Sequence, residues 1–159
     1  MIKYLIIFLP IFIIILLGSL FFIIKKITPD YKIIKIKINE KIFEVEIADT
    51  TLKKAKGLSG RKCLKNDEGV CSEPAEGMLF LFAKPTKQSF WMAGMNFPID
   101  IIWINGNKIV DISKNVQPPK NYELPAIVSP SIESNKVLEL SAGAVEKFNI
   151  KINDMVEIK

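Results

Sequence analysis

An uncharged apolar run of 21 residues, 4–24, dominates the first part of the chain. As an α-helix it is long enough to cross a hydrocarbon core of ~30 Å, and Pro10 can kink such a helix without preventing insertion. A cleaved signal peptide is the nearest alternative, but the run exceeds a usual signal core, and neither a small-residue cleavage site nor a lipobox cysteine follows it. We therefore expect an uncleaved, single-pass transmembrane anchor over residues 1–28, followed by one domain over residues 29–159.

The net charge of +5 arises mostly beside this run. Lys3, Lys25 and Lys26 flank it, whereas from Asp30 onward 19 lysines and arginines accompany 17 acids. The domain is therefore almost neutral overall. This balance argues against a nucleic-acid partner, and we interpret the domain's lysines as a solvated surface.

The orientation in the membrane follows from two opposing signals. Lys25 and Lys26 favour a cytoplasmic C-terminal side, while Lys3 and the amino terminus favour the reverse. Cys63 and Cys71 favour an oxidising exterior, where they could form a local disulfide. Two free thiols or a two-thiolate metal clip are the alternatives, but the chain has no histidine to complete a zinc site. We expect a cell-membrane protein with its C-terminal domain extracytoplasmic, and no metal or other cofactor.

Residues 33–38 and 43–47 alternate apolar and polar side chains with period 2, which predicts a hairpin of two half-buried strands. Placing Ile38 opposite Phe43 aligns the apolar faces and sets Lys37 against Glu44. Thr50 is a good N-cap for a short helix that ends at Gly57.

Further strands are predicted along the rest of the chain, at residues 78–82, 88–92, 99–104, 108–113, 137–140 and 155–158. Four prolines make residues 114–135 a proline-rich surface loop. A second short helix is expected from Ser141 to Phe148, with Asn149 in the left-handed conformation. The fold class is thus α+β, mainly β: a small, compact sheet or barrel-like domain with two short helices.

Candidate chemistry begins with the acids, because without histidine a general base must be Asp, Glu or Lys. Asp100 and Glu139 are lone acids within apolar strands, and Arg61 is the domain's only arginine. These three residues form a candidate pocket for a carboxylate-based enzyme. A structural ion pair between Arg61 and one of the acids is the more common arrangement.

A second candidate is an aromatic binding corner, in which a shallow groove takes a peptide, a glycan or another envelope component. Its residues are Met78, Phe90, Trp91, Met92, Phe97 and Pro98. Met92 and Met95 could also offer thioethers to Cu(I). Adaptable methionines are more often core filling, so a Cu(I)-handling domain is the least favoured reading.

Five short motifs in fixed order resemble the bacterial and archaeal domain of unknown function 192 (DUF192) family. They are Lys56-Gly57-Leu58 with Gly60-Arg61, Glu76-Gly77-Met78-Leu79-Phe80-x-Phe82, Phe90-Trp91-Met92, Pro98-Ile99-Asp100-Ile101-Ile102-Trp103 and Val137-Leu138-Glu139-Leu140-x-Ala142-Gly143. The resemblance implies a compact, mainly β domain behind a signal or anchor, and no established activity. The chain departs from the pattern at residues 93–96, where the family more often has a polar run, and in a longer loop around Cys63 and Cys71.

The function expected from the sequence is an extracytoplasmic binding or accessory module, anchored to the membrane through residues 4–24. Its partner would be an envelope ligand or protein, and the domain itself is expected to be monomeric. An enzyme using Asp100, Glu139 and Arg61 is the alternative, followed by Cu(I) handling.

Overall fold

The computed structural model describes the chain except for residues 1–9, 11, 19–29, 67–70, 72 and 122. The chain separates into two compact units, Met1–Asp30 and Tyr31–Lys159. In the first unit residues 10 and 12–18 are helical, and most of the predicted anchor lies outside the described residues. Among the residues that the structure does describe, no helix is both long and apolar enough to cross a membrane.

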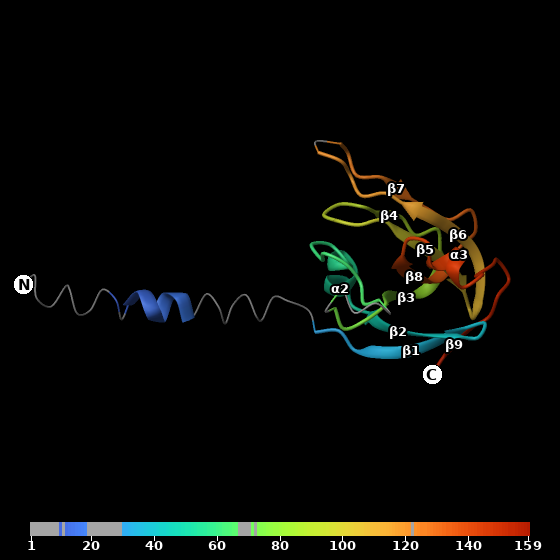
Figure 1. Ribbon diagram of the computed structural model, residues 1–159, viewed down its shortest axis with the longest axis horizontal. Helices are drawn as coiled ribbons and strands as arrows, with labels where there is room; N and C mark the ends of the chain where they lie inside the picture. The colour runs from blue at the N-terminus through green and yellow to red at the C-terminus, as the bar shows by residue number, and fades with distance from the viewer. Residues whose placement is uncertain (1–9, 11, 19–29, 67–70, 72, 122) are drawn as a thin grey trace, which may run out of the picture. The chain divides into compact units, whose positions relative to one another are not determined.

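In its described residues the second unit is a curved β-sheet with two short helices, so the expected mainly β, α+β class is confirmed (Figure 1). Seven strands lie in the order β6-β5-β8-β3-β2-β1-β9, and β4 and β7 form a separate two-stranded ribbon. The strands are β1 (Ile33–Ile38), β2 (Lys41–Ala48), β3 (Gly77–Thr86), β4 (Phe90–Trp91), β5 (Ile99–Asn105), β6 (Lys108–Val116), β7 (Ile127–Val128), β8 (Ser134–Ser141) and β9 (Val156–Ile158). The helices are α2 (Thr51–Lys56) and α3 (Ala144–Lys147).

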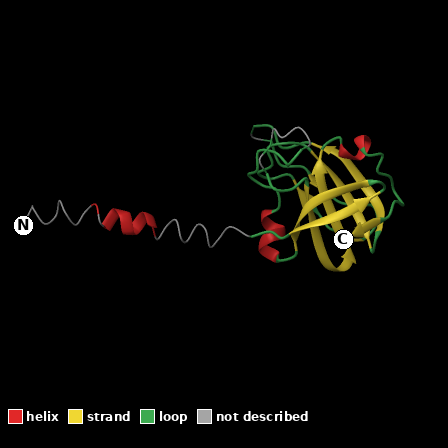
Figure 2. Cartoon of the chain, turned by 60° about the horizontal axis from the view of Figure 1, so that its bottom comes forward, coloured by secondary structure: helices red, strands yellow, loops and turns green. Residues whose placement is uncertain are grey.

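The large sheet wraps on itself into a barrel-like shape (Figure 2). Its described neighbours pair antiparallel except for β2 and β3, which run parallel. An antiparallel bridge between Lys108 and Met155 joins the start of β6 to the residue before β9. The first and last strands of the sheet order therefore meet at this point.

The first hairpin forms with a register two residues from the predicted one. Ile38 pairs with Lys41 and Ile36 with Phe43, because a tight turn at Asn39 and Glu40 replaces the expected four-residue loop. Asn39 adopts a left-handed φ of 55°, a conformation that asparagine tolerates well. A shift of two residues preserves the faces of both strands, so the predicted apolar side still points inward.

The middle of the chain differs more from expectation. Of the predicted strand over 88–92, Phe90 and Trp91 form β4, and they pair with Val128 and Ile127 of β7. Within the predicted loop over 114–135, β6 extends to Val116 and β7 supplies two ladder residues. Short pairing across a proline-rich segment gives almost no sequence signal.

The helix ends illustrate local rules. Thr50 caps α2 by accepting from the Lys53 N–H, and Gly57 ends it with a φ of 47°, as predicted. Asn149 is left-handed as predicted, but the predicted helix start at Ser141 is wrong, because α3 begins only after the left-handed Gly143.

Two apolar layers lie on opposite faces of the sheet. The inner layer fills the barrel and includes Phe43, Leu79, Leu138 and Leu140. The outer layer lies under the segments that follow α2 and β4; it contains Ala48, Leu58, Leu64, Met78, Phe80, Met92, Met95, Ile99, Ile101, Trp103 and Val137. Alternation along each strand assigns side chains to these layers, and this assignment decides where each acid points.

Candidate functional site

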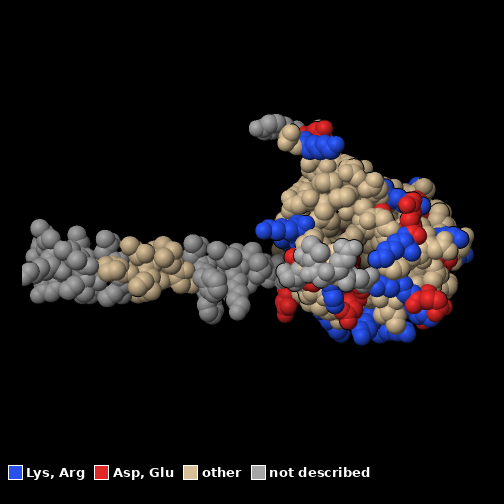
Figure 3. Space-filling view, viewed as in Figure 1, with Lys and Arg blue, Asp and Glu red and all other residues tan. Residues whose placement is uncertain are grey.

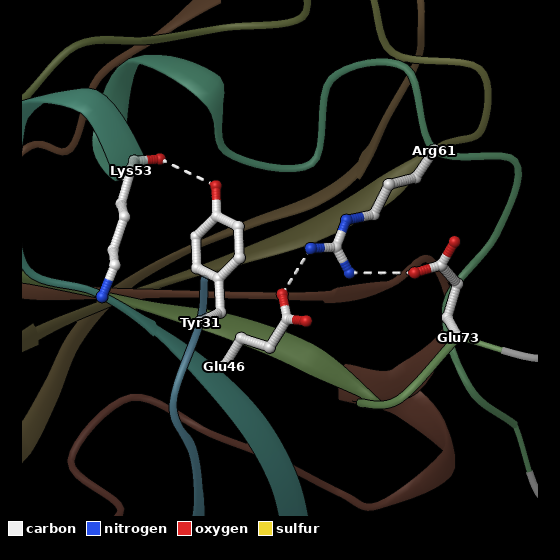
Figure 4. A network of polar contacts seen from close by, with 5 residues as sticks. All are labelled: Tyr31, Glu46, Lys53, Arg61 and Glu73. Atoms are coloured by element: carbon white, nitrogen blue, oxygen red, sulfur yellow. Dashed lines mark hydrogen bonds and ion pairs between the residues drawn. The ribbon is translucent and has the colours of Figure 1, made fainter. Parts of the chain in front are cut away.

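Arg61 fastens the segment after α2 to the sheet (Figure 4). Its guanidinium donates to the buried Glu46 of β2 and to Glu73, the latter at 3.1 Å. The guanidinium also lies 5.6 Å from the centre of the Tyr31 ring, whose hydroxyl donates to the Lys53 carbonyl at 3.4 Å. Burial raises the pKa of Tyr31. This network satisfies Arg61 with partners that sequence reasoning did not name.

Asp100 belongs to the other face of the sheet. It is 1% exposed, and its two carboxylate oxygens accept from the backbone N–H groups of Asn115 at 2.8 Å and Val145 at 2.9 Å. It thus ties the end of β6 and the first turn of α3 to β5. The predicted Arg61–Asp100 ion pair is wrong, because alternation along β5 turns Asp100 away from the outer layer.

Glu139 lies in the outer layer, in register with Met78 on one side and Ile101 on the other. It is 6% exposed, and burial raises its pKa to about 8, so the carboxyl is mostly protonated at neutral pH. An ion pair with Arg61 does not form, because the guanidinium instead reaches Glu46, on the far side of Met78. Arg61, Asp100 and Glu139 therefore do not converge on one site.

The predicted aromatic corner separates into core and surface. Met78 and Met92 are buried, together with Met95, as part of the outer layer. Phe90 packs edge-on against the rings of Phe80 at 4.8 Å and Trp103 at 5.5 Å.

The other members of the corner are less enclosed. Phe97 and Pro98 are half-buried, and Trp91 is 65% exposed. Of the six residues predicted to form one binding corner, Trp91 alone presents most of its side chain to solvent.

Cys63 and Cys71 form the predicted local disulfide, with their Cα atoms 6.1 Å apart. The bond closes a short loop immediately after Arg61. It therefore restrains the same segment that the Arg61 ion pairs hold against β2.

Sequence reasoning missed a cavity of about 250 Å³ at the end of the barrel where β3 begins. Phe43, Leu140 and Phe148 supply its apolar wall, and Ala142 and Ala144 leave it room. The remaining lining residues are Lys65, Asn66, Glu76, Ser141, Gly143 and Lys147. The motifs that surround it, Glu76-Gly77 and Leu140-x-Ala142-Gly143, were visible in the sequence, but their meeting across the barrel was not.

The cavity wall is held by charged contacts. Lys41 pairs with Glu76 at 2.8 Å and lies over the rings of Phe43 and Phe148. The other Glu76 oxygen accepts from the backbone N–H of Glu44 at 2.8 Å. Glu76 is thus fixed on two sides, and it positions the Phe43 edge of the cavity.

Gly77, at the start of β3, lies beside this wall and has no room for a side chain. A Cβ there would come within 2.3 Å of the Glu139 carbonyl oxygen and 2.7 Å of the Leu140 side chain. Only glycine allows β3 and β8 to approach so closely at this end of the barrel.

Comparisons with known proteins give a family and a fold. Residues 33–158 match the family DUF192, described as "Uncharacterized ACR". A crystal structure of a protein of unknown function from Novosphingobium aromaticivorans aligns with a TM-score of 0.66 and 28% identity, covering 79% of this chain and 84% of that one. A proposed transcription regulator from Sinorhizobium meliloti aligns with a TM-score of 0.68 over 82% and 97% of the two chains; at 23% identity, this likeness shows the fold alone. No curated protein matches.

Proposed function

Because the chain belongs to the DUF192 family, whose description assigns no activity, we propose a function from its own residues. The chain acts as a membrane-tethered, extracytoplasmic domain that binds a small, mostly apolar ligand with an anionic group. The observation that carries this proposal is the cavity formed by Phe43, Leu140 and Phe148.

The size and lining of the cavity support this ligand class. A volume of about 250 Å³ is just below the usual range for small-molecule sites and suits a compact ligand. Phe148, Ala142 and Ala144 are half-buried and offer apolar contact beside the buried Phe43 and Leu140. Lys65, which also pairs with Glu44 at 2.7 Å, and Lys147 bring positive charge to the lining. An amphipathic molecule could therefore place its apolar part against the Phe148 ring and a carboxylate beside the lysines.

Two further observations support the location. The uncharged run over residues 4–24 has the length of a membrane span. The Cys63–Cys71 disulfide is typical of oxidising compartments and rare in the cytosol. Together they favour a domain tethered on the outer side of the membrane.

A cavity-filling variant tests the binding claim. The probes are phenylacetate and hexanoate, added to the full chain in lipid nanodiscs and detected by saturation-transfer NMR. Ala142→Leu narrows the cavity and should abolish saturation transfer to both probes. Ala55→Leu, the same exchange at an exposed position of α2, should leave it unchanged.

Two results would contradict the proposal. One is the absence of saturation transfer from the parent protein to either probe. The other is equal transfer from Ala142→Leu and Ala55→Leu, which would place binding elsewhere or make it non-specific.

The location is tested separately with a reporter fused after Lys159. A reporter enzyme that requires export should be active, and one that requires the cytoplasm should be silent. The reverse pattern would refute the extracytoplasmic placement without bearing on the cavity.

A further inference from the structure

The β4–β7 ribbon has one buried and one exposed face. Phe90 and Val128, a cross-strand pair, pack against the outer apolar layer. Trp91 and Ile127, the other pair, face outward and are 65% and 73% exposed. Leu124, three residues before Ile127, is 93% exposed. We call these three outward side chains the Trp91 surface.

This exposure is unusual for side chains of this size. Trp91 and Ile127 are cross-strand neighbours on the ribbon, and Leu124 lies on the segment that leads into β7. Large exposed apolar side chains grouped in this way mark an interaction surface in a soluble protein. Figure 3 shows a broad uncharged region over the part of the molecule where Figure 1 labels β4 and β7.

The charges around the patch are mainly positive. The segments that carry it, residues 83–98 and 117–130, contain three lysines, Lys84, Lys87 and Lys120, against one acid, Glu123. All three lysines are exposed. The rest of the folded domain is nearly balanced, so this part of the molecule combines apolar side chains with an excess of positive charge.

We propose that the Trp91 surface docks on an anionic lipid surface, on the side of the membrane where the folded domain lies. Tryptophan favours the headgroup region, where its apolar ring and its indole N–H are both accommodated. Exposed lysines close to an anionic leaflet add electrostatic attraction. The proposal extends the proposed tether, because a tether would keep the domain at a high local concentration beside its own bilayer.

The two tryptophans of the chain make this contact directly measurable. Trp91 is exposed, whereas Trp103 is fully buried and donates its indole N–H to Ser113 at 3.1 Å. The full chain is reconstituted in vesicles of phosphatidylcholine with phosphatidylglycerol, with or without brominated acyl chains. Brominated lipid should quench part of the fluorescence of the parent, and Trp91→Phe, which leaves only Trp103, should show no quenching.

A second variant removes docking while it keeps the fluorophore. Leu124→Asp with Ile127→Asp changes only strongly exposed side chains, so folding should persist and quenching should fall to the level of Trp91→Phe. The matched control, Leu52→Asp with Ile152→Asp, alters two exposed apolar residues elsewhere and should leave quenching as in the parent. Replacing phosphatidylglycerol by phosphatidylcholine should weaken quenching.

Two results would overturn the docking proposal. One is an absence of quenching in the parent, which would leave a protein partner as the occupant of the Trp91 surface. The other is equal quenching in the parent and in the Leu124→Asp, Ile127→Asp variant. Flotation of the chain with the vesicles reports the tether independently, so a tethered chain without quenching refutes docking alone.

Discussion

Replacing Asp100 by asparagine tests the most demanding structural assignment, because it removes a charge without changing shape. In the native protein each carboxylate oxygen accepts one backbone N–H, from Asn115 and from Val145. Asparagine keeps one acceptor and turns an NH₂ group toward the other N–H. One buried donor is then left without a partner.

The magnitude follows from those two bonds. An unsatisfied buried donor costs about 1–3 kcal/mol, and the remaining bond loses its charge assistance. We expect Asp100→Asn to lower the free energy of unfolding by about 2–4 kcal/mol. Asp49→Asn is the control, since Asp49 pairs with Lys53 at the exposed surface at 3.1 Å, where the loss of an ion pair changes stability little.

Guanidinium denaturation measures the global effect, and amide hydrogen exchange locates it. The exchange of the Val145 and Asn115 amides should accelerate more than that of the β3 amides. If Asp100→Asn cost no more than Asp49→Asn, or if those two amides kept their protection, the assigned role of Asp100 would be refuted.

Three further predictions concern the packing and the buried charges of the sheet. Gly77→Ala should lower stability by about 2 kcal/mol or more, measured by denaturation, because the added Cβ meets a backbone carbonyl; unchanged stability would contradict the close approach. Burial raises the folded-state pKa of Glu139 from 4.5 to about 8, so the folded state binds this proton more tightly. The contribution of Glu139 to stability therefore falls as pH rises from about 4.5 to about 8, by about 1.4 kcal/mol per pH unit. Glu139→Gln should make the free energy of unfolding depend less on pH in this range, and the same pH dependence in parent and variant would refute this. Arg61→Met should cost about 3–5 kcal/mol by leaving Glu46 buried and unpaired. Adding Glu46→Gln should restore part of that loss, and strict additivity would contradict the pairing.

Local signals in the sequence predicted much of the fold. Thr50 and Gly57 delimit α2 because a cap and a left-handed stop act within a few residues. Alternation over residues 33–38 and 43–47 predicted the β1–β2 hairpin, although the turn at Asn39 decided its register. The disulfide was predictable because only two cysteines were available.

Contacts between distant segments were not predictable in the same way. Arg61 could have paired with any acid of the domain, and its choice of Glu46 depends on the parallel pairing of β2 and β3. The β4–β7 ribbon joins Phe90 to Val128 and Trp91 to Ile127, two ladder positions between distant segments, too few to produce a pattern. The cavity likewise appears only when β2, β8 and α3 come together.

Chemical-shift mapping of the full chain in nanodiscs, titrated with phenylacetate, tests the central claim most directly. The account predicts saturable shifts concentrated at Phe43, Leu140, Ala142 and Phe148, with little change at Trp91. An absence of saturable shifts, or shifts centred on the Trp91 surface, would contradict it.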